Sequence, residues 1–495
     1  MSGVFWVYAA LVGCGGDGGF AAITRVDDGI LTDVTDLRGL VFAADGRIYG
    51  SGFTDVNPVD RQTAVVRTTA DGALDPTFGD GGLVLLNLAQ GDEESLAIVE
   101  LEGGDVVVLA NVSDEQGGDP IPDIDGGDPV PRPNGQDVVL VRLDAQGELR
   151  TDFGDGGILR VTLGWEAADD ASWPVPTYTA SNAEATRFSG PGFPMDEAWD
   201  LDVDRSGASE RLVVFGLGSA ARVASGAQRI DADRYVVRLN ADGTPDASFH
   251  GGEAFTFHSE GALNDNARRG LVEADGTIVS VGYTNYGVGL DNHVIVLRLL
   301  PSGSPDPGFG FGFMPARAGA ARFNPYVVDG GASEAYGVTQ LSDGTYVATG
   351  YGFATASNTP SSLGYETTVA QDAVFFGFTE SGLSSGFGRD GELCIQSEAL
   401  ELASTEDRGR AVVALPDDRT VHAGRFGGDP ALFVVRPNGT LDRSVGDRGR
   451  IVYAGTGLAS NFFAVAVSPD GTRIAAATDA DPDGVLLAIL EVGTE

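Results

Sequence analysis

Lysine is absent from this chain of 495 residues, and histidine, methionine and tryptophan are rare. Arginine therefore carries all of the positive side-chain charge. The 31 arginines stand against 72 acidic residues, which gives a formal net charge of −41. Such a surface repels nucleic-acid phosphates, and no basic stretch with interleaved aromatic residues interrupts it. We therefore expect no nucleic-acid partner, whereas basic partners and divalent cations stay open.

Cysteine is scarce too, and the two that occur, Cys14 and Cys394, cannot form a disulfide framework. No apolar run is long enough to cross a bilayer. A short apolar run does end in Leu11-Val12-Gly13-Cys14, which resembles the bacterial lipobox and would place a lipid on Cys14. However, no arginine precedes this run, as a signal sequence would require.

Two interpretations of this N-terminal stretch stay open. Residues 1–14 form the signal-like segment of an exported lipoprotein at the outer membrane or cell surface, or the true start lies elsewhere and Leu11–Cys14 is repeat sequence. A secreted protein is the other outcome of export. In each case, membrane contact would come only through a lipid anchor.

Glycine is abundant, with 72 residues, and much of it falls in one phrase that recurs along the chain. The six copies are LDPTFGDGG from Leu74, LRTDFGDGG from Leu149, PDASFHGGE from Pro245, PDPGFGFGF from Pro305, LSSGFGRDG from Leu383 and LDRSVGDRG from Leu441. A recurring unit of this kind indicates stacked repeats with one continuous core. Its phenylalanine is expected to plug the space between neighbouring repeats, with the smaller Val445 in the sixth copy.

One repeat reads as four antiparallel strands. Residues 37–44, 47–53, 62–69 and 83–88 are apolar-rich, and Asp-Gly pairs at Asp45-Gly46 and Asp71-Gly72 supply turns. The third strands are continuously apolar, which is typical of a sheet packed between two others. A repeated four-stranded meander fits the blade of a β-propeller.

The two ends of the chain set the number of blades. Residues 462–492 supply only three strands, and Gly16-Asp17-Gly18-Gly19 repeats the phrase, so that residues 20–26 would form the missing strand. We predict an all-β, seven-bladed β-propeller of four-stranded antiparallel blades, closed by the N-terminal strand, as a single unit over residues 15–495. The predicted blades are 37–88, 95–163, 197–258, 267–317, 334–397, 408–454, and 461–492 with 16–26. Closure removes the open sheet edge.

The phrase LDPTFGDGG and the stretch VVLVRLDAQGELRTDFGDGG resemble the bacterial delta-60 repeat. That unit of roughly 60 residues carries L-D-x-[ST]-F-G-x-x-G-x-V. The resemblance covers nearly all of the chain after Cys14 and implies a propeller-like fold, but no defined activity. His250 in the third copy and Val445 in the sixth depart from the motif.

Long insertions fall on one face of the predicted propeller, at 111–136, 163–195, 217–234, 318–333 and 353–372. They favour a binding face, although long surface loops are also merely tolerated. The aromatic residues predicted for this face are Trp165, Trp173, Tyr178 and Trp199. They suit stacking on a sugar or a protein, or packing of the insertion on the propeller.

Counting back from the first turn of each blade predicts a ring of residues at the mouth of the central channel. The ring is Asp36, Glu94, Glu197, Asn266, Glu334, Arg408 and Asn461. It would bind a cation or a cationic ligand, or it would simply be solvated. Side chains three residues further on are mostly small, as expected for strands that crowd an axis.

The sequence contains few candidate motifs for metal binding or catalysis. The crowded carboxylates Asp119, Asp123, Asp125 and Asp128 are a weak calcium candidate, and the solvated loop is the alternative. No cofactor other than this calcium is expected, and no histidine pair has metal-binding spacing. We predict a monomeric, non-catalytic, exported or surface-anchored scaffold that binds a protein, peptide or glycan through its long-loop face. The alternatives are a hydrolase or lyase with an acidic site at the channel mouth, and a purely structural surface protein.

Overall fold

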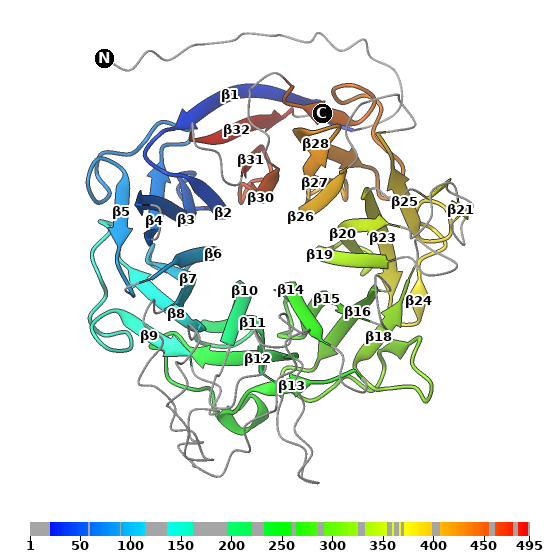
Figure 1. Ribbon diagram of the computed structural model, residues 1–495, viewed down its shortest axis with the longest axis horizontal. Helices are drawn as coiled ribbons and strands as arrows, with labels where there is room; N and C mark the ends of the chain where they lie inside the picture. Colours follow the sequence, from blue (N-terminus) through cyan, green and yellow to red (C-terminus); the bar gives the residue numbers. More distant parts are fainter. Residues whose placement is uncertain are drawn as a thin grey trace, which may run out of the picture.

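The chain folds into a closed ring of seven antiparallel sheets around a central axis (Figure 1). The structure is a computed structural model. It describes residues 20–57, 60–89, 91–113, 136–161, 196–219, 232–259, 264–285, 292–324, 332–353, 359–360, 366–367, 371–397, 406–454, 461–478 and 484–493. The predicted seven-bladed propeller is thereby confirmed. In the ranges just given, no helix has the length and hydropathy that a membrane crossing requires.

The first three strands of each blade run outward from the axis in chain order. The first three blades are β2 (Asp36–Phe42), β3 (Ile48–Asn57), β4 (Asp60–Thr68) and β5 (Leu83–Leu86); β6 (Glu93–Glu100), β7 (Val106–Ser113), β8 (Gln136–Leu143) and β9 (Ile158–Val161); and β10 (Asp196–Asp204), β11 (Arg211–Ser219), β12 (Ala232–Asn240) and β13 (Phe255–Phe257).

The fourth and fifth blades have an additional short strand each. They are β14 (Asp265–Val272), β15 (Ile278–Asn285), β16 (Asn292–Leu299), β18 (Ala320–Phe323) and β17 (Gly310–Phe311); and β19 (Ala332–Gln340), β20 (Tyr346–Phe353), β23 (Asp372–Thr379), β24 (Gly382–Leu383) and β25 (Glu392–Ile395). A separate two-stranded ribbon is formed by β21 (Thr359–Pro360) and β22 (Glu366–Thr367).

The ring closes where the last blade takes a strand from the other end of the chain. The sixth blade is β26 (Arg408–Ala414), β27 (Thr420–Phe426), β28 (Asp429–Val435) and β29 (Arg450–Val452), and the seventh is β30 (Phe462–Val467), β31 (Arg473–Thr478), β32 (Val485–Val492) and β1 (Ile23–Leu31). In Figure 1, β1 lies along the outer side of β32.

The register of this closing strand differs from the prediction. Val84 pairs with Val65 in the first blade, and the residue in the equivalent place of the seventh blade is Gly29, which pairs with Leu487. Aligning the glycine phrases predicts Ala21 there, eight residues earlier. The match of Gly16–Gly19 to the repeat phrase therefore does not set the register, which follows the backbone pairing of β1 with β32 over its length.

The fourth blade also corrects the predicted boundaries. Its outer strand is β18, which ends at Phe323 and pairs with β16, so the blade does not end at residue 317. The insertion predicted at 318–333 thus contains a strand of the blade. The cause is a longer turn: the Gly319 amide donates to the Phe309 carbonyl ten residues earlier, whereas in the first blade the Gly82 amide donates to the Phe78 carbonyl four residues earlier.

The phenylalanine of the repeat phrase plugs the joint between blades, as predicted. Phe78, for example, is fully buried in an apolar cluster that contains Tyr49 and Val65 of the first blade and Ile98 and Val108 of the second. The other copies are buried in the same way, with exposures of 0% for Phe153, 0% for Phe249, 2% for Phe309, 1% for Phe387 and 1% for Val445.

Polar contacts lock the same joints. The phrase aspartate Asp75 accepts an ion pair from the buried Arg67 at 2.9 Å, and the Gly79 amide donates to the Gln146 carbonyl of the next blade at 2.8 Å. The Arg67 guanidinium also lies over the Phe78 ring, 4.8 Å from its centroid. At the sixth joint, which has Val445, the ring of Phe20 lies near Arg419 and Arg436, at 5.2 and 5.5 Å.

Candidate functional site

All seven residues predicted to ring the channel occupy equivalent positions along the innermost strands, although Asn461 directly precedes its strand, β30. Every inner strand contains a β-bulge, and each ring residue lies two positions before the bulged residue. They therefore lie at one level of the channel, at the end from which the long connections leave. The ring consists of Asp36, Glu94, Glu197, Asn266, Glu334, Arg408 and Asn461.

The bulge residue itself, one pairing position further on, was missed by the sequence analysis. A bulged residue has no partner across the ladder, and its side chain can be re-aimed. The seven residues are Arg38, Leu96, Trp199, Arg268, Tyr336, Arg410 and Phe463, and in β14 the next residue, Arg269, is unpaired as well. From the third blade round to the first, arginine and aromatic residues alternate.

This alternation creates a chain of cation–π contacts around the axis. Arg268 lies over Trp199 at 3.8 Å and near Tyr336 at 4.9 Å, measured from the guanidinium carbon to the ring centroid. Arg410 lies 4.6 Å from Tyr336 and 5.4 Å from Phe463, and Arg38 follows at 5.1 Å from Phe463. Guanidinium groups stacked on aromatic faces in this way remain charged yet sit in partly apolar surroundings. We call these seven residues the bulge ring.

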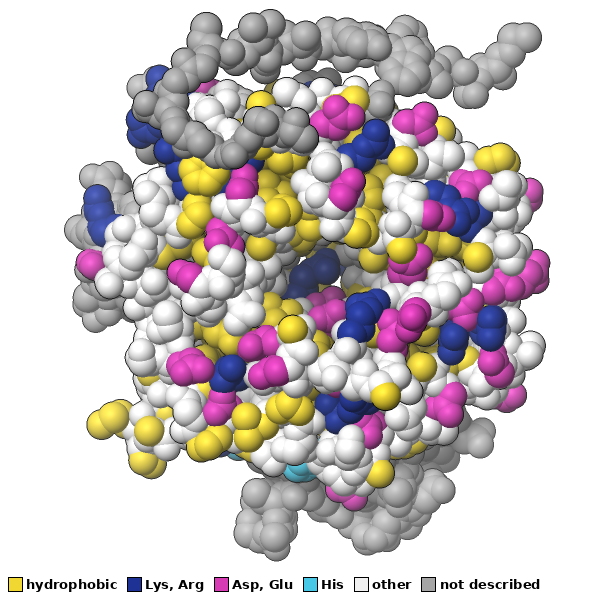
Figure 2. All heavy atoms as spheres, turned by 180° about the vertical axis from the view of Figure 1, so that it is seen from behind, with side chains coloured by type: hydrophobic (Ala, Val, Ile, Leu, Met, Phe, Trp, Pro, Cys, Tyr) yellow, Lys and Arg dark blue, Asp and Glu magenta, His cyan; other side chains and the backbone are white. Residues whose placement is uncertain are grey.

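Arg269 crosses the channel just below the bulge ring. The equivalent residues of the other blades are small, as in Gly39 and Ala97, except for Asp200. Arg269 donates to the carbonyl oxygens of Arg38, at 2.9 Å, and Phe463, at 3.4 Å, on the opposite side of the ring, and lies 3.7 Å from Asp200. Figure 2 shows basic side chains inside the central hollow. The small residues thus make room for a strut that joins the fourth blade to the seventh and first.

The carboxylates of the predicted ring are engaged by arginines and hydroxyl groups. Arg38 donates to Asp36 at 2.8 Å and to Glu94 at 3.1 Å, and Arg61 also reaches Glu94 at 3.0 Å. Glu334 accepts hydrogen bonds from the Asn292 amide, at 2.5 Å, and the Tyr336 hydroxyl, at 3.3 Å. The channel mouth is therefore a mixed ionic network rather than a uniformly acidic ring.

The sixth blade reverses the charge balance of this network. Arg408, Arg410 and Arg425 lie there together, and within the described ranges their ion pairs go to Glu406 alone, at 2.9 Å from Arg408 and 3.5 Å from Arg425. Arg410 makes no ion pair or hydrogen bond with any residue that the structure describes, and its Nε atom is buried without a partner. We call these three arginines the sixth-blade arginine cluster.

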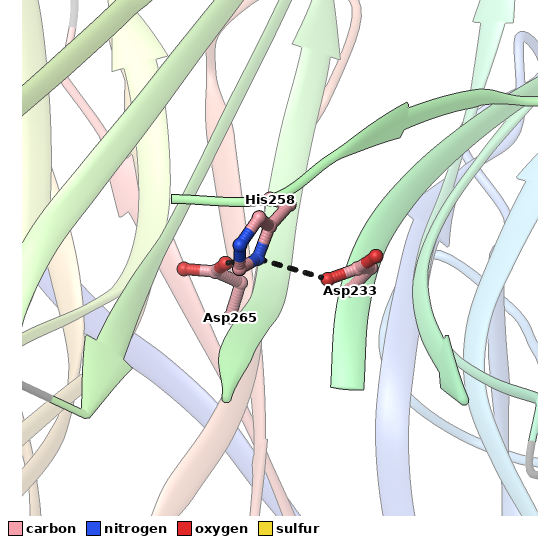
Figure 3. A group of neighbouring side chains, drawn as sticks. All are labelled: Asp233, His258 and Asp265. Carbon is pink, nitrogen blue, oxygen red and sulfur yellow. Dashed lines mark ion pairs between the residues drawn. The ribbon is translucent and has the colours of Figure 1, made fainter. Parts of the chain in front are cut away.

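A second polar cluster lies between the third and fourth blades (Figure 3). His258 follows β13, and its Nδ1 atom lies 3.4 Å from Asp233 Oδ1 and 3.7 Å from Asp265 Oδ2. Both aspartates are buried, whereas the imidazole is about one third exposed, at 31%. The histidine also lines a hollow of about 350 Å³, with Pro305 and Arg317.

The remaining predicted residues lie elsewhere. Trp199 belongs to the inner strand β10 and to the bulge ring, and not to the long-loop face. Cys14, the aromatic residues Trp165, Trp173 and Tyr178, and the loop carboxylates Asp119, Asp123, Asp125 and Asp128 lie outside the described residues. The Asp200–Asp202 pattern forms a joint, because these carboxylates accept the Gly270 and Val272 amides of the next blade, at 2.9 and 2.7 Å.

Comparison with known proteins supports a propeller-type repeat family. A family model described as a domain of unknown function (DUF5122) beta-propeller matches residues 43–78, 229–249 and 273–309. Each matched stretch ends at a plug phenylalanine, Phe78, Phe249 or Phe309. The more specific delta-60 resemblance stays a prediction. A search of curated proteins finds no match.

Solved structures resemble the chain over almost its whole length at low identity. A protein of unknown function from Dyadobacter fermentans is 10% identical, with a TM-score of 0.43 and coverage of 95% of this chain and 99% of that chain. A gluconolactonase from Xanthomonas campestris is also 10% identical, with a TM-score of 0.34 and coverage of 96% and 98%. Neither likeness carries an argument about function.

Proposed function

We propose that this protein is a non-catalytic binding propeller, and that it binds a ligand carrying an isolated carboxylate at the long-loop end of its channel. The sixth-blade arginine cluster is the observation that carries the proposal. The chain has a net charge of −41, yet within the described residues the ion pairs of Arg408 and Arg425 go only to Glu406, and Arg410 has none. Guanidinium groups bind carboxylates through charge-assisted, often bidentate hydrogen bonds.

The neighbouring side chains suit such a ligand. Tyr336, Tyr351 and Phe463 flank Arg410 with their rings, and Arg410 has a buried Nε donor without a partner. Aromatic faces beside a guanidinium give a ligand apolar contact next to its charged group. An isolated carboxylate at a peptide C-terminus or on a glycan meets this requirement, whereas a polyanion would be repelled by the rest of the surface.

The sixth blade has a short connection between its second and third strands on this face. The second and third strands are joined by only two residues in the sixth blade, Gly427 and Gly428, and in the first, 58 and 59. The corresponding connections run from Ser113 to Gln136 in the second blade and from Phe353 to Asp372 in the fifth. The predicted aromatic residues Trp165, Trp173 and Tyr178 lie outside the described residues and stay a prediction from the sequence for this face.

A matched pair of variants tests the proposal. Arg410→Gln removes the charge at the channel, and Arg150→Gln removes the charge of an arginine in the second copy of the repeat phrase, on the opposite face. Both are titrated with peptides bearing a free or amidated C-terminus and with uronic-acid oligosaccharides as free acids or methyl esters. We expect the wild type and Arg150→Gln to prefer the free acid of one series, and Arg410→Gln to lose roughly tenfold or more in affinity for it.

Equal binding of acid and ester, or unchanged binding by Arg410→Gln, would contradict the proposal. Conversion of any member of the panel, followed by mass spectrometry, would instead favour the hydrolase or lyase alternative. Export and lipidation of Cys14 are part of the proposal and rest on the Leu11–Cys14 sequence. Loss of labelled fatty acid from a Cys14→Ser variant expressed in a bacterial host is the expected result.

A further inference from the structure

The Asp233, His258 and Asp265 cluster has a counterpart at another joint of the same propeller. By strand register, Asp372, Gln396 and Asp407 take the same three places between the fifth and sixth blades. Gln396 donates to Asp372 at 2.8 Å, and the Ser397 amide donates to Asp407 Oδ2 at 2.6 Å. The Ser259 amide donates to Asp265 Oδ2 at the same distance of 2.6 Å. The two joints therefore share one backbone frame.

The two joints differ in the hydrogen bonds that the buried carboxylate of the following blade accepts. Both oxygens of Asp407 accept backbone amides, because Gly427 donates to Oδ1 at 2.9 Å. Glu93, in the same place at the first joint, accepts the Thr63 amide at 2.9 Å and the Ala89 amide at 2.8 Å on its two oxygens. Asp265 uses only Oδ2, and its Oδ1 is fully buried without a hydrogen-bond partner. An unsatisfied buried carboxylate oxygen is costly and calls for a ligand.

No arginine in the described part of the chain donates a hydrogen bond to this carboxylate, although the positive charge of the buried Arg234 attracts it. The buried Arg234 directs its donors to the Ile295 carbonyl, at 3.0 Å, and the Ser280 hydroxyl, at 2.5 Å. Arg317 donates to the Ser259 carbonyl instead.

We infer that Asp233, His258 and Asp265 form a binding site for a divalent transition-metal ion at the joint between the third and fourth blades. The His258 nitrogen lies 3.4 and 3.7 Å from the two aspartate oxygens, near the separation of about 3.4 Å between ligands that a tetrahedral ion holds at about 2.1 Å, and all three donor atoms lie within 4.8 Å of one another. A mixed nitrogen and carboxylate set suits Zn²⁺, Co²⁺ or Mn²⁺. The exposed part of His258 faces the adjoining hollow, which leaves room for further ligands.

Binding would join two blades through one ion and neutralise the charge of two buried carboxylates at once. The ion requires a neutral imidazole, so any proton on Nδ1 of His258 leaves as the metal enters. This site is independent of the sixth-blade arginine cluster, and its failure would leave the proposed carboxylate site untouched.

The chain itself supplies the control variant, because His258→Gln converts this joint to the form seen at Gln396. Metal-free protein is titrated with Co²⁺ in excess Mg²⁺, which occupies oxygen-only sites, and the visible d–d absorption is followed. We expect saturation at one Co²⁺ per chain, displacement by Zn²⁺, and a loss of affinity of more than about tenfold in His258→Gln. Zn²⁺ should raise the melting temperature of the wild type and not that of the variant.

Absence of the Co²⁺ bands in the wild type, or equal bands and equal Zn²⁺ stabilisation in His258→Gln, would overturn the inference and leave an ordinary hydrogen-bonded joint. If His258→Gln does not fold, Asp233→Asn keeps the size of the side chain while weakening a ligand. It is expected to lose the bands too, and retention of full affinity by Asp233→Asn would equally overturn the site.

Discussion

The plug phenylalanines make the most quantitative prediction of this fold. Phe153 is fully buried in an apolar cluster that contains Leu109 and Leu140 of the second blade and Leu201 and Val214 of the third. Substitution by alanine removes apolar contacts from both blades and leaves a cavity that two rigid sheets cannot close. Phenylalanine-to-alanine changes at such sites cost about 3–5 kcal/mol.

The expected shift in melting temperature follows from this cost in free energy and the unfolding entropy of the chain. An unfolding entropy of about 2.1 cal/mol/K per residue gives about 1 kcal/mol/K for 495 residues. Phe153→Ala is therefore expected to lower the melting temperature by about 3–5 °C if the ring unfolds as one unit. Calorimetry gives the shift, and hydrogen exchange is expected to show faster opening of the second and third blades.

The sixth joint offers a graded control. Val445→Ala removes two carbon atoms from the same structural position and is expected to cost about 1–2 kcal/mol. Phe20 still stands beside the arginines of that joint in the variant. A Phe153→Ala protein that melts within 1 °C of the wild type, or that loses no more stability than Val445→Ala, would refute the role of the phrase as the plug between blades.

Three further predictions concern pH and closure. Burial raises the pKa of Glu392 to about 8, whereas in the unfolded state this carboxyl loses its proton near pH 4.3. Between these two values the folded state holds a proton that the unfolded state has lost. The free energy of unfolding therefore falls as pH rises, by about 1.4 kcal/mol per pH unit. Glu392→Gln is expected to remove that fall in melting temperatures recorded from pH 4.5 to 8. Burial lowers the pKa of His422 to about 3, so stability is lost as pH falls from about 6.5 towards 3. In urea titrations, His422→Phe is expected to reduce this loss of unfolding free energy at acid pH. An unchanged dependence of the unfolding free energy on pH would count against a buried neutral imidazole. Deletion of residues 1–31 removes β1 and exposes the edge of β32, so size-exclusion chromatography should show association, whereas deletion of residues 1–19 should leave a single species.

The candidate sites were only partly predictable from sequence. The channel-mouth positions followed from counting back from turns, because every inner strand has the same length to its first turn. The bulge ring did not follow, since a bulge moves one side chain out of the strand's alternation and no local residue preference marks it. The alternation of arginine and aromatic residues at those positions was the available signal.

Contacts between residues on opposite sides of the ring could not be predicted from local sequence patterns. Arg269 and Arg38 are 231 residues apart, and only the closure of seven blades brings the guanidinium to that carbonyl. His258 likewise meets Asp265 because two neighbouring blades share a joint, and the difference from Gln396 becomes visible only when the joints are superposed by register.

The sequence by itself determined the repeated blade, the number of blades and the buried plug, because strands, glycine turns and apolar runs are encoded locally and recur at fixed intervals. Tertiary structure alone decided the register of the closing strand, the outer strand of the fourth blade and the charge of the channel. These depend on which residues face one another across a closed ring, and that geometry is set by the backbone pairing and bulges of all seven sheets together.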